Sequence, residues 1–137
     1  MVKDMYCDHC GECCKDTEMM LSEEDVKRIE RLGLKRNEFS YEKDGFLFLK
    51  NKDGFCVFYN KEQKRCNIYP YRPLGCRFYP IIFDLEDQRV IVDKLCHLWH
   101  TVTDEELKRA KPRVKKFVRR LLIERSMRLK KKNEETV

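Results

Sequence analysis

Eight cysteines in a chain of 137 residues constrain the possible fold more than any other feature. They are Cys7, Cys10, Cys13, Cys14, Cys56, Cys66, Cys76 and Cys96. A disulfide framework needs an oxidising compartment, yet the first 20 residues hold acidic side chains and four cysteines where a secretion signal would be apolar. We therefore expect a cytoplasmic protein whose thiolates bind metal, with disulfides as the alternative in a hyperthermophile.

The number and spacing of the cysteines limit the metal centres that the chain could form. Four thiolates complete a tetrahedral zinc site or hold one 4Fe–4S cluster, so eight suffice for two centres without requiring two. Two residues separate Cys7 from Cys10 and Cys10 from Cys13, which lets a turn aim several sulfurs at one ion. We expect an iron–sulfur cluster of the 4Fe–4S type or Zn²⁺, and the spacing leaves both open.

The adjacent pair Cys13 and Cys14 differs from the other cysteines. Neighbouring side chains of an extended dipeptide point to opposite sides, so we expect the two thiols to serve different centres or one of them not to bind. Imidazole is also a good zinc ligand, which makes His9 and His100 alternative donors. With eight cysteines present, neither histidine is required.

A centre with four thiolates carries a formal charge of about −2, which nearby positive groups must offset in a protein interior. Arg72 and Arg77 lie four residues before and one residue after Cys76. We expect both arginines to lie beside the centre and donate hydrogen bonds there. The alternative is that both are ordinary surface residues.

Length and composition indicate one small α+β domain. Hydrophobic residues make up 42% and charged residues 39% of the chain, a balance that is typical of a folded protein and excludes a membrane bundle. We expect a cysteine-cluster metal-binding domain over 1–103, with a basic helical extension over 104–137 packed on the same domain.

Local patterns predict a helix and a hairpin in the first half of the chain. Ser22 and Asp25 form a capping motif, and apolar residues recur at helical spacing until Gly33, which predicts a helix over 23–32. Segments 46–50 and 55–59 flank a turn-like Asn-Lys-Asp-Gly sequence, which predicts a hairpin with Cys56 on its returning strand.

The middle of the chain contains a proline-rich segment and a second hairpin. Three prolines and one glycine in 67–80 exclude a long helix and favour a fixed extended path that presents Cys76 rigidly. Segments 81–85 and 89–93 predict a hairpin around residues 86–88. We expect the following Trp99 to belong to the core.

The C-terminal segment is predicted to be helical. Thr103 and Glu106 form a capping box, and Pro112 divides the run into helices over 104–111 and 112–131 or kinks a single helix. We expect the polar tail after Lys130 to fray. The apolar stripe expected to face the core consists of Val114, Phe117, Val118, Leu121 and Leu122.

The positive charge of the chain is concentrated in this helical segment. Residues 104–137 contain 13 Lys and Arg against 6 Asp and Glu, whereas the preceding residues are nearly balanced. Such asymmetry indicates a nucleic-acid-binding or acidic-partner surface over Lys108–Lys132. The alternative is a solvated helix face. No stretch is apolar enough for a membrane span, so we expect no membrane partner.

Three separated blocks of the sequence resemble one known family. They are CDHCGECC, the phrase LSEEDVKRIERLGL with Phe39, and CNIYPYRPLGCRFYP. In this order they resemble the YkgJ-type cysteine-cluster proteins, also called the zinc- or iron-chelating CxxCxxCC domain, over residues 5–100. The basic helical segment lies outside the shared pattern.

The resemblance implies a metal-binding or iron–sulfur-binding fold in which all eight cysteines stand at motif positions. A similar cysteine domain occurs in flagellin lysine N-methylases, so a metal- or cluster-dependent enzyme with an open coordination position is a further alternative. This chain lacks their additional length, and methyl transfer is not carried over to it.

Overall fold

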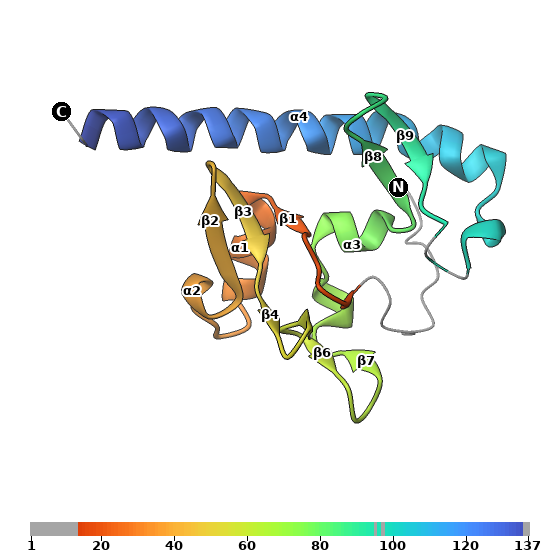
Figure 1. Cartoon of the computed structure of the whole chain (residues 1–137), viewed down its shortest axis with the longest axis horizontal. Helices are drawn as coiled ribbons and strands as arrows, with labels where there is room; N and C mark the ends of the chain where they lie inside the picture. Colours follow the sequence, from red (N-terminus) through yellow and green to blue (C-terminus); the bar gives the residue numbers. More distant parts are fainter. Residues whose placement is uncertain (1–13, 95, 97, 136–137) are drawn as a thin grey trace.

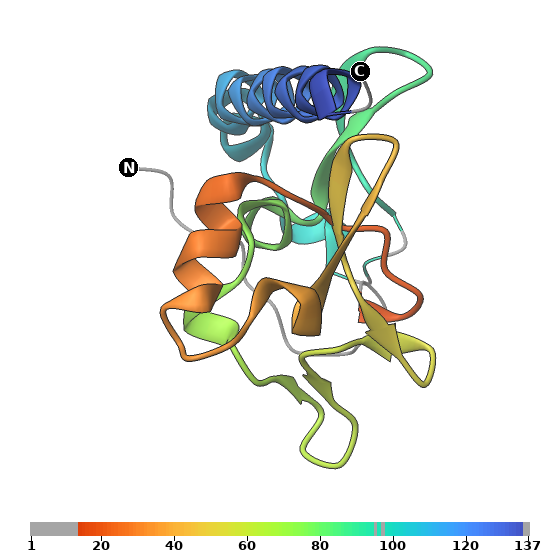
Figure 2. The same ribbon diagram turned by 90° about the vertical axis from the view of Figure 1, so that its left-hand side faces the viewer.

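The computed structural model describes residues 14–94, 96 and 98–135. Short helices and strand pairs form the lower part of the molecule, and one long C-terminal helix runs across the top (Figure 1). Seen along that helix, the β8–β9 hairpin stands beside it, and most of the other elements lie below it (Figure 2). The architecture is the small α+β fold predicted from the sequence.

Helix α1 (Glu23–Glu30) forms as its capping motif predicts. The Ser22 hydroxyl accepts a hydrogen bond from the Asp25 backbone N–H, and the Ser22 N–H donates to the Asp25 carboxylate, each at 3.1 Å. Val26 and Ile29 are fully buried on one face. The predicted helix is confirmed, although it ends two residues early and leaves Leu32 exposed.

A three-stranded antiparallel sheet corrects the first predicted hairpin. Helix α2 (Arg36–Phe39) leads into β2 (Ser40–Lys43), which pairs with β3 (Phe46–Leu49), and β3 also pairs with β1 (Met20–Leu21). The predicted hairpin is confirmed next to its turn, where the Val57 N–H donates to the Lys50 carbonyl at 2.9 Å, but 46–49 pairs with β1 and β2 and not with 55–59. The sequence has two Asp-Gly turns. The turn that joins β2 to β3 is formed by Asp44 and Gly45, and both of these residues have positive φ.

Two further small hairpins carry cysteines. The second Asp-Gly turn joins β4 (Asn51–Lys52) to β5 (Phe55–Cys56), so Cys56 does lie on a returning strand. A polar turn then joins β6 (Tyr59–Asn60) to β7 (Arg65–Cys66).

The proline-rich segment is helical rather than extended. It forms the 3₁₀ helix η2 (Tyr69–Tyr71) and the short helix α3 (Leu74–Phe78), which carries Cys76. The predicted extended path is wrong because Pro73 occupies the position before the first turn of α3, where its missing N–H and fixed φ are tolerated. The prolines limit the length of the helices and do not prevent them.

The second predicted hairpin is confirmed. Strand β8 (Ile81–Asp84) pairs with β9 (Arg89–Val92), in a register that runs from Ile81 opposite Val92 to Asp84 opposite Arg89. Ile81 and Val90 are buried against the C-terminal helix. The 3₁₀ helix η3 (Trp99–Thr101) follows, and its Trp99 is 39% exposed, so the prediction that this ring belongs to the core is wrong.

Helix α4 (Asp104–Glu135) begins with the predicted capping box. The Glu106 N–H donates to the Thr103 hydroxyl at 3.1 Å, and the Thr103 N–H donates to the Glu106 carboxylate at 3.3 Å. The helix continues through Pro112 to Glu135, so two separate helices and a frayed end after Lys130 are both wrong. Pro112 has no N–H to donate to the carbonyl four residues earlier in the helix. Because Pro112 is exposed, water can bind that carbonyl instead.

The hydrophobic residues form two cores. The first lies among α1, the three-stranded sheet and the cysteine hairpins, and the second lies between the β8–β9 hairpin and α4. Val114 and Leu121 are buried, and Phe117 and Val118 pack partly buried against the second core. Leu122 is 52% exposed, so its place in the predicted stripe is wrong.

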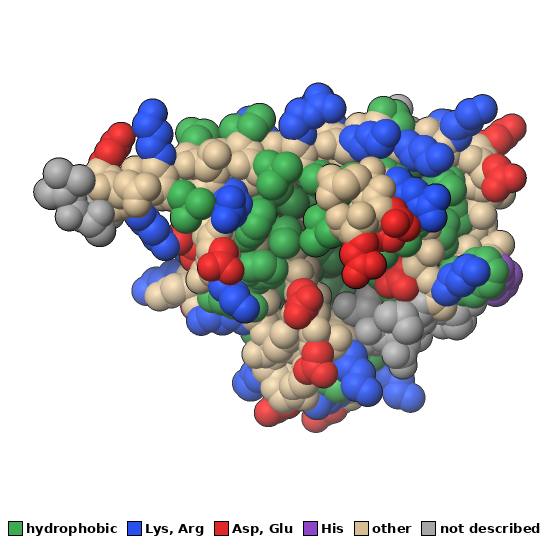
Figure 3. All heavy atoms as spheres, turned by 45° about the horizontal axis from the view of Figure 1, so that its top comes forward, with side chains coloured by type: hydrophobic (Ala, Val, Ile, Leu, Met, Phe, Trp, Pro, Cys, Tyr) green, Lys and Arg blue, Asp and Glu red, His purple; other side chains and the backbone are tan. Residues whose placement is uncertain are grey.

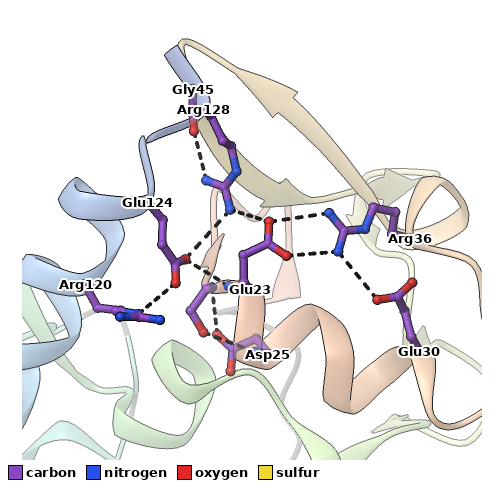
Figure 4. A network of polar contacts seen from close by, with 9 residues as sticks. Glu23, Asp25, Glu30, Arg36, Gly45, Arg120, Glu124 and Arg128 are labelled. Carbon is purple, nitrogen blue, oxygen red and sulfur yellow. Dashed lines mark hydrogen bonds and ion pairs between the residues drawn. The ribbon is translucent and has the colours of Figure 1, made fainter. Parts of the chain in front are cut away.

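Polar contacts attach α4 to the start of α1 (Figure 4). The buried Glu124 carboxylate accepts a hydrogen bond from the Glu23 backbone N–H at 2.9 Å. Arg128 donates to the Glu23 carboxylate and to the Gly45 carbonyl, each at 2.9 Å, and Arg36 donates to Glu23 from the opposite side. The contacts that Glu124 and Arg128 make with Glu23 join residues about one hundred positions apart, while the division into 1–103 and 104–137 stays a prediction.

No helix in the described ranges has both the length and the apolar character needed to cross a bilayer.

Candidate metal centre

Four of the predicted cysteine ligands belong to one region of the structure. Cys56 is a buried member of the first core, and Cys14, Cys66 and Cys76 pack partly buried against that core. They come from four separate segments of the chain. Cys14 precedes β1, whereas the other three lie on β5, β7 and α3, in the order Cys56, Cys66 and Cys76. Cys7, Cys10 and Cys13, like His9, lie outside the described residues.

Backbone pairing aligns Cys14 with Cys56. Lys15 forms an antiparallel bridge with Phe55, and the Asp16 N–H donates to the Gly54 carbonyl at 2.8 Å. Antiparallel register pairs the residue before one bridge partner with the residue after the other, so Cys14 falls opposite Cys56. The last residue of the CxxCxxCC run is thereby brought next to a cysteine more than 40 positions away.

Asn51 holds the segment after Cys14 in this position. Its side-chain amide donates to the Thr17 carbonyl at 2.9 Å, and its side-chain oxygen accepts from the Thr17 N–H at 3.0 Å. Asn51 is also the strand partner of Cys56. Sequence reasoning assigned Asn51 only to a turn, since nothing local indicates a partner 34 residues away.

Asp25 positions the short helix that carries Cys76. Its buried carboxylate accepts a hydrogen bond at 3.0 Å from the N–H of Leu74, the first residue of α3, and another at 2.7 Å from Arg28. Sequence reasoning identified Asp25 only as a helix cap. Gly75 assists from the other side, because a Cβ there would overlap the sulfur of Met19.

Arg72 lies close to Cys76, as predicted for a charge beside the centre. Its side chain is buried and donates to the Tyr69 carbonyl at 3.0 Å and to the Cys76 carbonyl at 3.4 Å, with the guanidinium carbon 3.9 Å from the Tyr69 ring centroid. Arg77 is partly buried on α3. The surface alternative is therefore wrong for Arg72, and a role of either arginine toward a metal stays a prediction.

Aromatic rings surround the gathered cysteines. The Phe39 and Phe58 rings lie 5.8 Å apart at the centre of the first core, and the Phe55 and Tyr59 rings stack at 5.2 Å beside the two hairpins. Tyr59 is the strand partner of Cys66. Such an apolar and aromatic environment limits the access of water to the thiols.

Cys96, the fifth cysteine of the described residues, belongs to the segment between β9 and η3. It precedes η3, and its carbonyl accepts from the Trp99 N–H at 3.0 Å. His100, the alternative donor named from the sequence, is exposed and belongs to the 3₁₀ helix η3. Within residues 14–94, 96 and 98–135, no three His, Cys, Asp or Glu side chains stand in a geometry that could hold a metal ion.

The described candidate donors are thiols from separate segments that pack on one core, and thiolates are ligands of both zinc and iron–sulfur centres. The molecule is thus a small cysteine-rich domain of the metal-binding class. The chain belongs to the CxxCxxCC family, described as a putative zinc- or iron-chelating domain, whose model matches residues 6–97. This confirms the resemblance noted from the three sequence blocks.

Comparison with the curated proteins and with the solved structures gave no match. The family description supports metal binding and does not distinguish zinc from iron.

Proposed function

We propose that the protein binds a metal centre through cysteine thiolates, with Cys14, Cys56, Cys66 and Cys76 among the ligands. The observation that carries the proposal is the packing of these four residues around the same core, although up to 62 positions separate them in the sequence. A metal centre held by thiolates draws its ligands from segments that fold together in this way. The cysteines of the N-terminal run supply the further donors.

We propose that this centre is an iron–sulfur cluster, of the 4Fe–4S type. All the proposed ligands are thiols, which suits such a cluster, and the apolar rings of the first core would restrict the access of water and oxygen to it. When bound, a cluster supplies a one-electron redox centre and a covalent link between chain segments. Arg72 would offset its negative charge from the side of Cys76.

Cys96 is proposed to serve a second centre or a separate position of the same one. Because Cys96 stands on a separate segment between β9 and η3, we expect its loss to affect bound metal differently from the loss of Cys56. The eight cysteines would allow two centres.

Anaerobic purification followed by iron, sulfide and zinc analysis tests the proposal. We expect about four irons and four sulfides per cluster, with a brown colour that Cys56→Ser and Cys76→Ser each abolish or strongly reduce. Ser126→Ala, on the exposed side of α4, is the control and should keep the full metal content.

Stoichiometric zinc in a colourless protein would overturn the cluster assignment and keep the thiolate centre. A protein without bound metal, or metal content that does not change in Cys56→Ser and Cys76→Ser, would overturn the proposed function itself.

A further inference from the structure

A basic groove of about 690 Å³ lies between β9, η3 and the first turns of α4. Four of its lining residues are cationic, and one is a carboxylate, Asp104. We call it the basic groove and define it by its cations, Arg89, Lys94, Lys111 and Lys115.

The cations of the basic groove are weakly neutralised. Lys111 and Lys115 are exposed and have no ion-pair partner in the described part of the chain. Arg89 pairs with Asp87 at 3.5 Å, but both side chains are more than half exposed, and such surface pairs contribute little. The groove therefore keeps a positive potential that attracts anions.

An exposed aromatic ring lies within the same groove. Trp99 lines it, with Lys94 Nζ 5.1 Å from the ring centroid and the His100 ring perpendicular to it at a centroid distance of 6.0 Å. Val90, Val102 and Leu107 line the groove as well and belong to or pack on the second core, so its wall is rigid. A flat ring beside cations on a fixed wall is an arrangement that binds a planar base.

The charge continues beyond the groove along α4. Lys108, Lys111, Lys115 and Arg119 recur at spacings of three and four residues and therefore share one side of the helix. This row extends over roughly 16 Å at 1.5 Å per residue. Residues 107–123 contain no Asp or Glu, and Figure 3 shows Lys and Arg side chains along the outer side of α4.

We propose that the basic groove binds single-stranded nucleic acid, with a base stacked on Trp99 and successive phosphates along the row of cations on α4. A linear polyanion with planar bases uses both the ring and the charges, whereas an anionic lipid surface would use only the charges. The described residues of this site are not the proposed metal ligands, so the inference does not rest on the proposed function.

Trp99 makes the test direct because it is the only tryptophan of the chain. The metal-loaded full chain is titrated with 20-nucleotide uridine RNA and thymidine DNA, and binding is followed by Trp99 fluorescence and by the anisotropy of a labelled oligonucleotide. We expect quenching of Trp99 at the same concentrations that raise the anisotropy. Affinity should fall with salt at a slope near −2 to −3, as for three or four phosphate contacts to a single strand.

Variants separate the groove from general positive charge. Lys111→Glu with Lys115→Glu should weaken binding at least tenfold and reduce the salt slope by about 1.4. The matched control, Lys130→Glu with Lys131→Glu, reverses the same charge on the same helix outside the groove and should change binding twofold or less. Trp99→Ala, followed by anisotropy, should weaken binding roughly tenfold. Each variant must have the circular dichroism spectrum and the metal content of the parent protein, so that a change in affinity does not reflect misfolding.

Four results would overturn the proposal. The Lys130→Glu, Lys131→Glu control could lose as much oligonucleotide affinity as the groove variant, or the oligonucleotide could bind without any change in Trp99 fluorescence. Uridine monophosphate could bind as tightly as the oligonucleotide, or the protein could bind phosphatidylserine vesicles and neither RNA nor DNA.

Discussion

The cysteine region is built from strands of two to four residues and helices of at most eight, whereas α4 runs unbroken for 32 residues. Two-residue strands are too short to be stable alone, because each offers few hydrogen bonds and little buried surface. A long helix is stabilised by its own backbone hydrogen bonds and by the packing of one face against the core. The two regions therefore differ in what orders them, which is long-range polar contacts in one and local helical contacts in the other, and the proposed metal would add to the first.

Removal of the metal should show the largest difference between the two regions. Chelation or oxidative loss of the centre is expected to lower the Tm by roughly 15 °C or more, because binding to the native state adds to the stability of folding. Hydrogen exchange should then speed up at the amides of β4–β7 and much less at those of α4. An unchanged Tm after removal of the metal would contradict this account.

Loss of the Asp25 carboxylate should have the next largest effect. Asp25→Ala removes the acceptor for Ser22, Arg28 and Leu74, and we expect the free energy of unfolding to fall by about 3 kcal/mol because these donors become unsatisfied in a buried site. Denaturant unfolding measures the change. Glu24→Ala, one residue away and exposed on the same helix, should stay within about 0.5 kcal/mol. Equal effects of the two substitutions would refute the assigned role.

Asn51→Ala should have a smaller effect confined to the cysteine region. Two hydrogen bonds to Thr17 are lost, and we expect a decrease of about 1.5 kcal/mol in the free energy of unfolding, together with weaker retention of the metal. Asn67→Ala, at an exposed position beside Cys66, is the matched control. Metal retention by Asn51→Ala equal to that of Asn67→Ala would show that the Thr17 contact does not position Cys14.

Acidification should produce the smallest effect, at the junction between α1 and α4. Burial opposes ionisation of Glu23, but hydrogen bonds and charge from Arg128 and Arg36 more than offset it and hold the pKa of this carboxyl below its ordinary value of 4.5. A lowered pKa stabilises the folded state above pH 4.5, and this contribution is lost as the pH falls below that value. After solvent screening, we expect less than about 1 kcal/mol.

Glu23→Gln is the variant that isolates this titration. Its stability should depend less on pH than that of the parent below pH 4.5, as measured by denaturant unfolding at several pH values. A pH profile identical to that of the parent protein would contradict the assignment.

Local signals predicted part of this fold correctly. The capping boxes at Ser22 and Thr103 and the alternation of β8 and β9 act over a few residues, so the corresponding elements were found near their observed bounds. The hairpin around residues 51–54 was predicted, but the one closed by Asp44 and Gly45 was missed, because both Asp-Gly turns satisfy the same pattern and only the fold decides which strand 46–49 pairs with.

For the candidate site too, local signals were informative and long-range contacts could not be predicted. The identity of the thiols and their family could be inferred from spacing and resemblance. The contacts that bring them together could not, since Asn51 reaches Thr17 across 34 residues and Asp25 reaches Leu74 across 49. The exposure of Trp99 was also missed, because an aromatic residue in a short loop-rich chain is more often buried than presented at a surface.

X-ray absorption spectroscopy of the anaerobically purified protein tests the thiolate centre most directly. The account predicts an iron edge with sulfur neighbours at about 2.3 Å and an iron–iron distance typical of a cluster, and Cys56→Ser should diminish the signal. A metal surrounded by oxygen and nitrogen, or the absence of any metal at stoichiometric amounts, would contradict the claim that these cysteines converge on an inorganic centre.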